Sequence, residues 1–80
     1  MKKATTSSGT YYLFNKKDQK TPIVFVHGVG LTHEIWQPQL DFFKECTTLT
    51  YDILGHGKSP LNKEIISFND FSDQIIELID

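Results

Sequence analysis

Residues 23–26 form an unbroken run of β-branched and aromatic side chains, Ile-Val-Phe-Val, which ends at residues 27–30, His-Gly-Val-Gly. A strand that is apolar on both faces is typical of a parallel sheet covered on both sides. A second β-rich run, residues 46–51, ends at Asp52 and is followed by a glycine-containing loop over residues 53–60. Two strands that each end in such a loop predict an α/β sheet with helical crossovers.

Helical spacing follows the first of these strands. Trp36, Leu40 and Phe43 fall at positions i, i+4 and i+7, which lines one face of a helix. Pro38 lies near the first turn, where a missing N–H costs little. The spacing predicts a helix over residues 37–44 whose aromatic and leucine side chains face the core.

A second helix is predicted over residues 67–80. Ser67 and Asp70 are spaced as a capping box at its start. The apolar stripe still runs at Asp80, with no Gly or Pro to stop it, so we expect the chain to end in a helix. The stripe consists of Phe68, Phe71, Ile75, Leu78 and Ile79.

The first part of the chain is β-rich as well. Residues 10–14 predict a strand, and Ser8-Gly9 is a candidate hairpin turn after a first arm over residues 2–7. Counted from the strand over residues 10–14, the element order is β-β-α-β-α, an α/β arrangement with a mostly parallel sheet. Because an open parallel edge is a liability, we expect further sheet on the C-terminal side. We therefore expect residues 1–80 to be the N-terminal portion of one larger domain.

Composition excludes several classes of function. The chain has 80 residues, a net charge of −2, and eight scattered lysines without any arginine, which argues against a nucleic-acid partner. Cys46 is the only cysteine, so a disulfide framework is impossible. The N-terminus has no apolar stretch typical of a secretory signal, and the longest apolar run, residues 23–26, is too short to span a membrane. We expect a soluble cytoplasmic protein without a membrane partner.

Two phosphate-binding motifs are incomplete. The third glycine of a dinucleotide-binding G-x-G-x-x-G is replaced by His33. A phosphate loop ending at Gly57-Lys58-Ser59 would need glycine where Asp52 stands. The three histidines lack metal-ligand spacing. We therefore expect no cofactor and no metal.

The two glycine-containing loops together resemble the α/β-hydrolase family. The matching segments are the apolar strand ending in His-Gly over residues 23–30, Trp36 with Pro38-Gln39, and Tyr51-Asp52-Ile53-Leu54-Gly55-His56-Gly57-Lys58-Ser59. The resemblance covers residues 10–80 and is nearest to small esterases and enol-lactonases. Leu54 departs from the pattern, because the family usually has arginine there.

The resemblance implies part of an oxyanion hole in this chain. Acyl transfer builds negative charge on a carbonyl oxygen, and backbone N–H groups aimed at that oxygen stabilise it. In this fold one such donor comes from the loop after the third strand. The expected donor is the Val29 backbone N–H, and Gly28, Gly30 and Leu31 are the expected substrate-binding residues.

Other polar residues near these loops are expected to be structural. In the family the catalytic base lies near the C-terminus, so His27 is not expected to be the base. Asp52 is expected to hold the Gly-His-Gly turn, and Ser59 lacks the G-x-S-x-G setting of a nucleophile. His56 is expected to pack within its loop, and His33 to be exposed near the helix start.

The resemblance implies a serine-type hydrolase that cleaves a small carboxylic ester or lactone in the intact protein. No G-x-S-x-G elbow occurs within these 80 residues, so the triad is expected downstream. Two alternatives stay open: an aspartate nucleophile, as in dehalogenases and epoxide hydrolases, and a binding module without catalysis. Those aspartate branches usually carry proline or Asn-Pro after His-Gly, so Val29-Gly30 favours serine.

Overall fold

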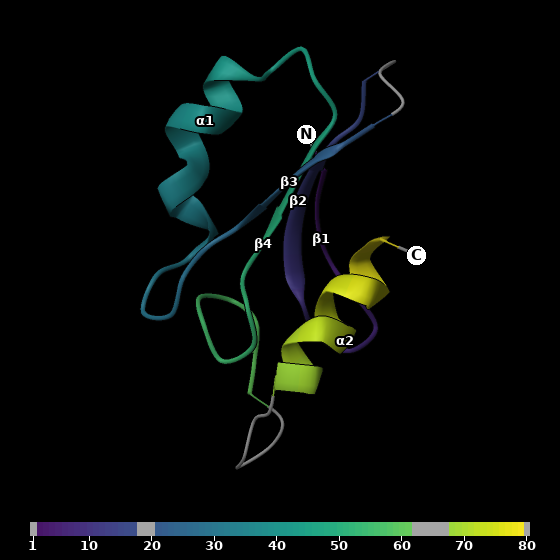
Figure 1. Ribbon diagram of the computed structural model, residues 1–80, viewed down its shortest axis with the longest axis vertical. Coiled ribbons are helices and arrows are strands. Elements are labelled where there is room, and N and C mark those ends of the chain that lie inside the picture. The colour runs from purple at the N-terminus through teal and green to yellow at the C-terminus, as the bar shows by residue number, and fades with distance from the viewer. Residues whose placement is uncertain (1, 18–20, 62–67, 80) are drawn as a thin grey trace.

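The computed structural model describes residues 2–17, 21–61 and 68–79. Within these ranges, three strands precede the first helix, and strands and helices alternate from the third strand onward (Figure 1). The elements are β1 (Lys2–Thr5), β2 (Tyr11–Asn15), β3 (Ile23–Val26), the 3-10 helix η1 (His33–Trp36), α1 (Gln37–Phe42), β4 (Thr48–Tyr51) and α2 (Phe68–Ile79).

One four-stranded sheet joins the strands in the order β1-β2-β4-β3. β3 and β4 are parallel, with Ile23 opposite Thr48 and Val26 opposite Tyr51. β1 and β2 form an antiparallel hairpin, and β2 is antiparallel to β4. The α/β class is confirmed, but parallel pairing within the described residues is confined to β3 and β4. The hairpin enters the sheet beside β4, a long-range pairing that local sequence does not encode.

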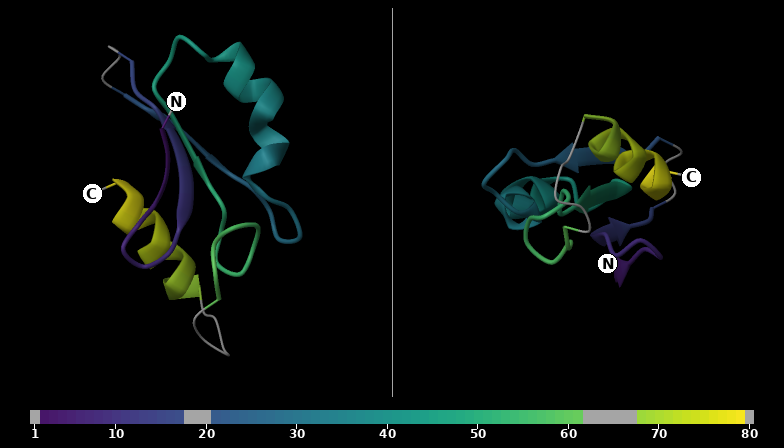
Figure 2. Two further views of the ribbon diagram at one scale, coloured as in Figure 1. Left: turned by 180° about the vertical axis from the view of Figure 1, so that it is seen from behind. Right: turned by 90° about the horizontal axis from the view of Figure 1, so that it is seen from below.

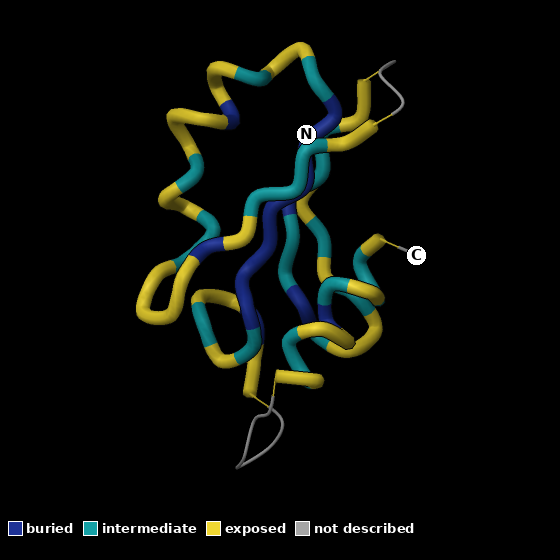
Figure 3. Tube along the Cα trace, in the orientation of Figure 1, coloured by how far each residue is buried: buried dark blue, intermediate teal, exposed yellow. Residues whose placement is uncertain are grey.

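The two α-helices lie on opposite faces of this sheet, as the view from below shows (Figure 2). β4 is the most enclosed strand, and all four of its residues are buried (Figure 3). Thr50 in this strand donates its hydroxyl to the carbonyl oxygen of Phe25, 3.2 Å away. A buried hydroxyl with a partner avoids the cost of an unpaired polar group.

The helical face predicted from Trp36, Leu40 and Phe43 packs against β3. The Phe25 ring lies 5.1 Å from the Trp36 ring and 6.2 Å from the Phe43 ring, and Leu40 is buried. These contacts confirm the core role expected for this face. Offset or tilted aromatic pairs at such distances stabilise a core beyond their buried area.

The helical segment begins earlier than predicted and ends earlier as well. Thr32 caps η1 by accepting a hydrogen bond at its side-chain oxygen from the Glu34 N–H, 3.3 Å away. The helix then passes from η1 into α1 and ends at Phe42, where the Phe43 N–H donates to the Gln39 carbonyl oxygen. The prediction of residues 37–44 missed η1 because a threonine cap leaves no periodic apolar signal.

The second predicted helix is α2, although residues 67 and 80 lie outside the described ranges. Its apolar stripe is only partly covered: Phe71 is half-buried, whereas Phe68 is exposed. The most buried side chain of α2 is the polar Gln74. Among the described residues, no helix is long and apolar enough to cross a membrane.

Candidate functional site

The loop that follows β3 contains the expected oxyanion donor, Val29, and the three expected substrate-binding residues, Gly28, Gly30 and Leu31. The Leu31 N–H donates to the Gly28 carbonyl oxygen at 3.2 Å, which closes a turn over residues 28–31. Gly30 has a φ of +88°, a conformation that side chains disfavour. Val29 is 83% exposed at the tip of this turn. The carboxyl end of a parallel strand is where ligands bind in open α/β sheets.

His27 fixes the peptide unit that carries the expected donor. Its buried ring bridges two loops: Nδ1 lies 2.8 Å from the Gly28 carbonyl oxygen, and Nε2 accepts the Ile53 N–H at 3.0 Å. Nδ1 therefore carries the proton. The Gly28 carbonyl and the Val29 N–H belong to one planar trans peptide, so holding the carbonyl orients the N–H. With both ring nitrogens engaged, His27 has no lone pair for a base, as expected.

The two N–H groups at the tip of this loop differ in their partners. The Gly30 N–H donates to His56 Nε2 at 2.9 Å. The Val29 N–H has no hydrogen-bond partner among residues 2–17, 21–61 and 68–79. The amide chosen from the sequence is therefore the one left free to donate to another molecule.

Asp52, directly after β4, holds the second loop to the first. Its fully buried carboxylate accepts the His33 N–H and the His33 Nδ1–H, both 2.7 Å from Oδ1, and the Lys58 N–H, 2.9 Å from Oδ2. Burial alone would raise the pKa of Asp52. The hydrogen bonds from Lys58 and His33 and the charge of His33 lower this pKa by more than burial raises it, so the net pKa lies below its usual value. This geometry agrees with the structural role expected for Asp52.

His33 is not the exposed residue expected from the sequence. Its side chain is only 13% exposed because it bonds Asp52 and packs 5.2 Å from the Tyr11 ring. The sequence gives no sign of this contact, since 19 residues separate His33 from Asp52. Ser59 is buried, and its hydroxyl oxygen accepts the Tyr11 N–H at 3.0 Å, which suits the expectation that it is not a nucleophile.

Gln74 is a site-supporting residue that sequence reasoning missed. Its Oε1 accepts the Leu54 N–H at 3.1 Å, and its Nε2 donates to the Asp52 carbonyl oxygen and to Thr10 Oγ1, each at 3.0 Å. These bonds tie α2 to the loop after β4. A signal was present: Gln74 stands three residues after Phe71 and four before Leu78, so a polar side chain interrupts the apolar face.

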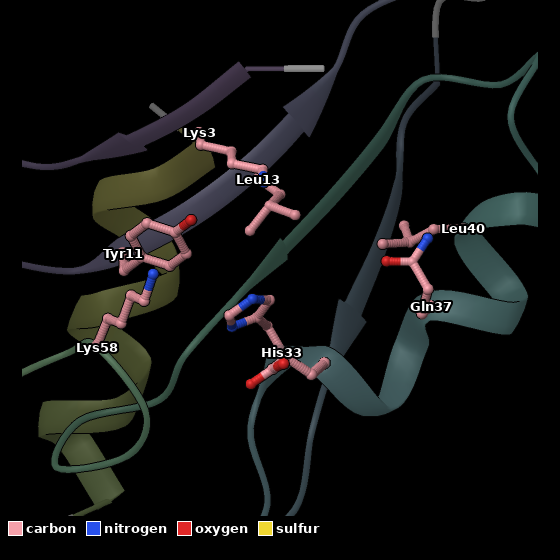
Figure 4. A pocket seen from close by; sticks show the side chains of 8 residues that line it. Lys3, Tyr11, Leu13, His33, Gln37, Leu40 and Lys58 are labelled. Atoms are coloured by element: carbon pink, nitrogen blue, oxygen red, sulfur yellow. The ribbon is translucent and has the colours of Figure 1, made fainter.

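A separate hollow of about 270 Å³ lies on the α1 side of the sheet (Figure 4). Tyr11, Leu13, His33 and Lys58 face it, and it includes none of residues 28–31. Its walls therefore lie apart from the expected oxyanion donor. No group of three His, Cys, Asp or Glu side chains within the described ranges is arranged to hold a metal ion.

Comparison with known proteins gives relatives over most of the chain. The (E)-2-((N-methylformamido)methylene)succinate hydrolase of Acinetobacter baylyi is 39% identical over 59 residues, which are 72% of this chain and 22% of the relative. The non-heme chloroperoxidase CPO-A1 of Kitasatospora aureofaciens is 30% identical over 77 residues, 94% of this chain and 28% of the relative. The 3-oxoadipate enol-lactonase 1 of Acinetobacter baylyi is 30% identical over 67 residues, 82% of this chain and 25% of the relative.

The chain thus spans between 22% and 28% of the length of these relatives. No family model matches the chain. All three relatives carry the names of enzymes. The sheet, the two loops at its carboxyl edge and these relatives show that the chain belongs to the α/β-hydrolase family.

Proposed function

We propose that this chain is the N-terminal part of a serine-type hydrolase that cleaves a small carboxylic ester or lactone. The observation that carries the proposal is the free Val29 N–H at the tip of the loop after β3, beside a Gly30 N–H that His56 occupies. A preorganised backbone donor at such a position stabilises the oxyanion of acyl transfer. Gly28, Gly30 and Leu31 would border the substrate.

The topology supports a continuation of the domain beyond this chain. Crossovers between parallel strands are right-handed, so helices on opposite faces belong to crossovers that run in opposite directions. The crossover from β3 through α1 leads to β4, and α2 lies on the other face. The crossover through α2 would therefore lead back past β3, to the outer edge of β3, where no described strand is paired.

A strand at that edge would bring the nucleophile close to Val29. Neighbouring strands lie about 4.8 Å apart, so the carboxyl end of a parallel strand beside β3 would emerge next to the loop over residues 28–31. Two apolar side chains at this end, Val26 and Leu31, are 46% and 45% exposed. A further strand beside β3 could cover them. A serine elbow there would attack the carbonyl carbon while the Val29 N–H receives the oxyanion.

The name of one relative, an enol-lactonase, supports lactone chemistry, and none of the names defines a substrate for this chain. One relative is named as a hydrolase, one as an enol-lactonase and one as a chloroperoxidase. A small molecule with an acyl carbonyl is the substrate class compatible with the first two names. We further propose a cytoplasmic location and catalysis that requires no cofactor.

The test begins with the gene. Translating the same frame for about 30 codons past Asp80 covers one further strand and its turn, given ordinary strand and loop lengths. G-x-S-x-G there supports the serine hydrolase, and the intact protein should then show a burst of p-nitrophenol from p-nitrophenyl acetate. G-x-D-x-G would transfer the proposal to dehalogenase or epoxide hydrolase chemistry. An elbow without a nucleophile would favour a binding module.

A further inference from the structure

His56 links the two glycine loops through one side chain. Its Nδ1 lies 2.9 Å from the Leu54 carbonyl oxygen, and its Nε2 accepts the Gly30 N–H at 2.9 Å. A carbonyl oxygen can only accept, so Nδ1 carries the proton and Nε2 offers its lone pair to Gly30. The hydrogen bonds thereby set both the tautomer and the orientation of the ring.

This contact holds the peptide unit next to the expected oxyanion donor. His27 orients the unit that contains the Val29 N–H, through the Gly28 carbonyl oxygen. His56 orients the following unit, through the Gly30 N–H. Two consecutive peptide planes are therefore each fixed by one histidine, and the rings of these histidines lie 5.6 Å apart.

The loop needs such a hold because glycine is conformationally permissive. Gly30 has a φ of +88°, and an added Cβ would meet nothing within 4 Å, so neither sterics nor packing confines this residue. Val29 is also largely exposed. Among the described contacts, the hydrogen bond from the Gly30 N–H to His56 is the one that holds the Gly30 backbone, in addition to the Leu31–Gly28 turn bond and the His27 contact with Gly28.

The turn that carries His56 is itself anchored to a buried residue. The His56 N–H donates to the Ile53 carbonyl oxygen at 3.0 Å, and the Leu54 N–H donates to Gln74 Oε1. Gln74 is 5% exposed and also binds the Asp52 carbonyl oxygen. His56 is thus presented by a fixed turn, which allows its ring to define the position of Gly30.

We propose that His56 is a positioning residue for the oxyanion donor. By occupying the Gly30 N–H it leaves the Val29 N–H as the free amide of the loop tip and keeps that amide in one orientation. This proposal rests on the proposed hydrolase function. Since the oxyanion exists only after attack on the carbonyl, loss of His56 should lower kcat while KM stays nearly constant.

The test compares three variants of the intact protein. His56→Ala removes the acceptor, His56→Gln supplies an acceptor oxygen with a reach similar to Nε2, and Lys58→Ala is a control in the same turn. The Lys58 ammonium lies over the Tyr11 ring, 4.9 Å from its centroid, and the Lys58 side chain makes no described hydrogen bond to Gly30. Rates are normalised to active sites titrated from the burst, so that unfolded protein does not count.

We expect His56→Ala to lower kcat about 10- to 100-fold, the effect of a small misplacement of a catalytic group. His56→Gln should recover most of this loss, and Lys58→Ala should leave kcat unchanged. A kcat for His56→Ala equal to that of the unmodified protein, per titrated site, would overturn the proposal.

A second readout does not need activity. Hydrogen exchange measured by mass spectrometry should become faster over residues 27–31 in His56→Ala and stay unchanged in His56→Gln. If the unmodified protein cleaves no ester or lactone, the proposed function fails, and exchange alone decides whether His56 holds the loop. Equal exchange rates in His56→Ala and the unmodified protein would contradict the proposal that His56 holds this loop.

Discussion

The Asp52 Oδ1 atom lies 2.7 Å from both the backbone nitrogen and the Nδ1 atom of His33. One carboxylate oxygen thus receives two hydrogen bonds from the residue that begins η1, while Oδ2 binds the Lys58 N–H of the other loop. Because Asp52 is fully buried, these three donors compensate its lost hydration. Asp52 is therefore the junction at which the loops after β3 and β4 are held together.

Replacing Asp52 by Asn should destabilise the intact protein. The amide keeps one acceptor oxygen but places an NH2 group against a backbone N–H, so a part-buried donor loses its partner. We expect the free energy of unfolding to fall by about 3 kcal/mol. Urea unfolding measures it, with Asp73→Asn on the exposed side of α2 as the control. Equal midpoints for the two variants would contradict the role of Asp52.

The lowered pKa of Asp52 predicts acid sensitivity. Folding lowers the pKa of this carboxyl, so the native state binds fewer protons than the unfolded state does at acidic pH. The stabilisation is fully present above the unfolded pKa of about 3.9 and is lost as the pH falls through the lower native pKa. The free energy of unfolding should therefore decrease below about pH 4, and Asp52→Asn should flatten that decrease. An identical pH dependence in both proteins would refute this assignment.

Gly57 and Gly30 should respond differently to alanine. A Cβ on Gly57 would overlap the Asp52 carboxylate, whereas a Cβ on Gly30 would meet nothing. Gly30→Ala carries only the strain of its positive φ, about 1–2 kcal/mol. Gly57→Ala must also displace Asp52, so we expect a larger loss of stability. Thermal melts of both variants give the order, and a more stable Gly57→Ala would contradict the packing.

Gln74→Ala should cost more than its position on a helix suggests. The truncation leaves the Leu54 N–H, the Asp52 carbonyl oxygen and the Thr10 hydroxyl without their partner. We expect a loss of about 2–3 kcal/mol in the free energy of unfolding. Gln39→Ala, an exposed glutamine of α1, is the matched control and should change stability little. Similar losses in both variants would mean that the three bonds of Gln74 contribute nothing.

Local signals predicted the strands of this sheet well. The apolar run over residues 23–26 is β3, with the same bounds. A short run of β-branched and aromatic residues that is followed by glycine strongly favours a strand. The second run was predicted to start at residue 46, but β4 begins at Thr48. The place of β2 beside β4 could not be predicted, because pairing between distant strands is set by the whole sheet.

The contacts that shape the site escaped prediction for another reason. The bonds from His33 to Asp52 and from Gly30 to His56 join residues 19 and 26 positions apart. They depend on loop conformations, which have no hydrophobic periodicity. Val29 was singled out by the family resemblance, and its role as oxyanion donor stays a prediction.

The central claim is tested most directly by removing the Val29 N–H while keeping the valine side chain. Incorporating the α-hydroxy analogue of valine at position 29 of the intact protein replaces that N–H by an ester oxygen and keeps the side chain. We predict that kcat/KM for an ester substrate falls about 100- to 1000-fold, as for loss of an oxyanion donor. Val29→Ala, which retains the N–H, should stay near the unmodified value. An α-hydroxy variant as active as the unmodified protein would contradict the account.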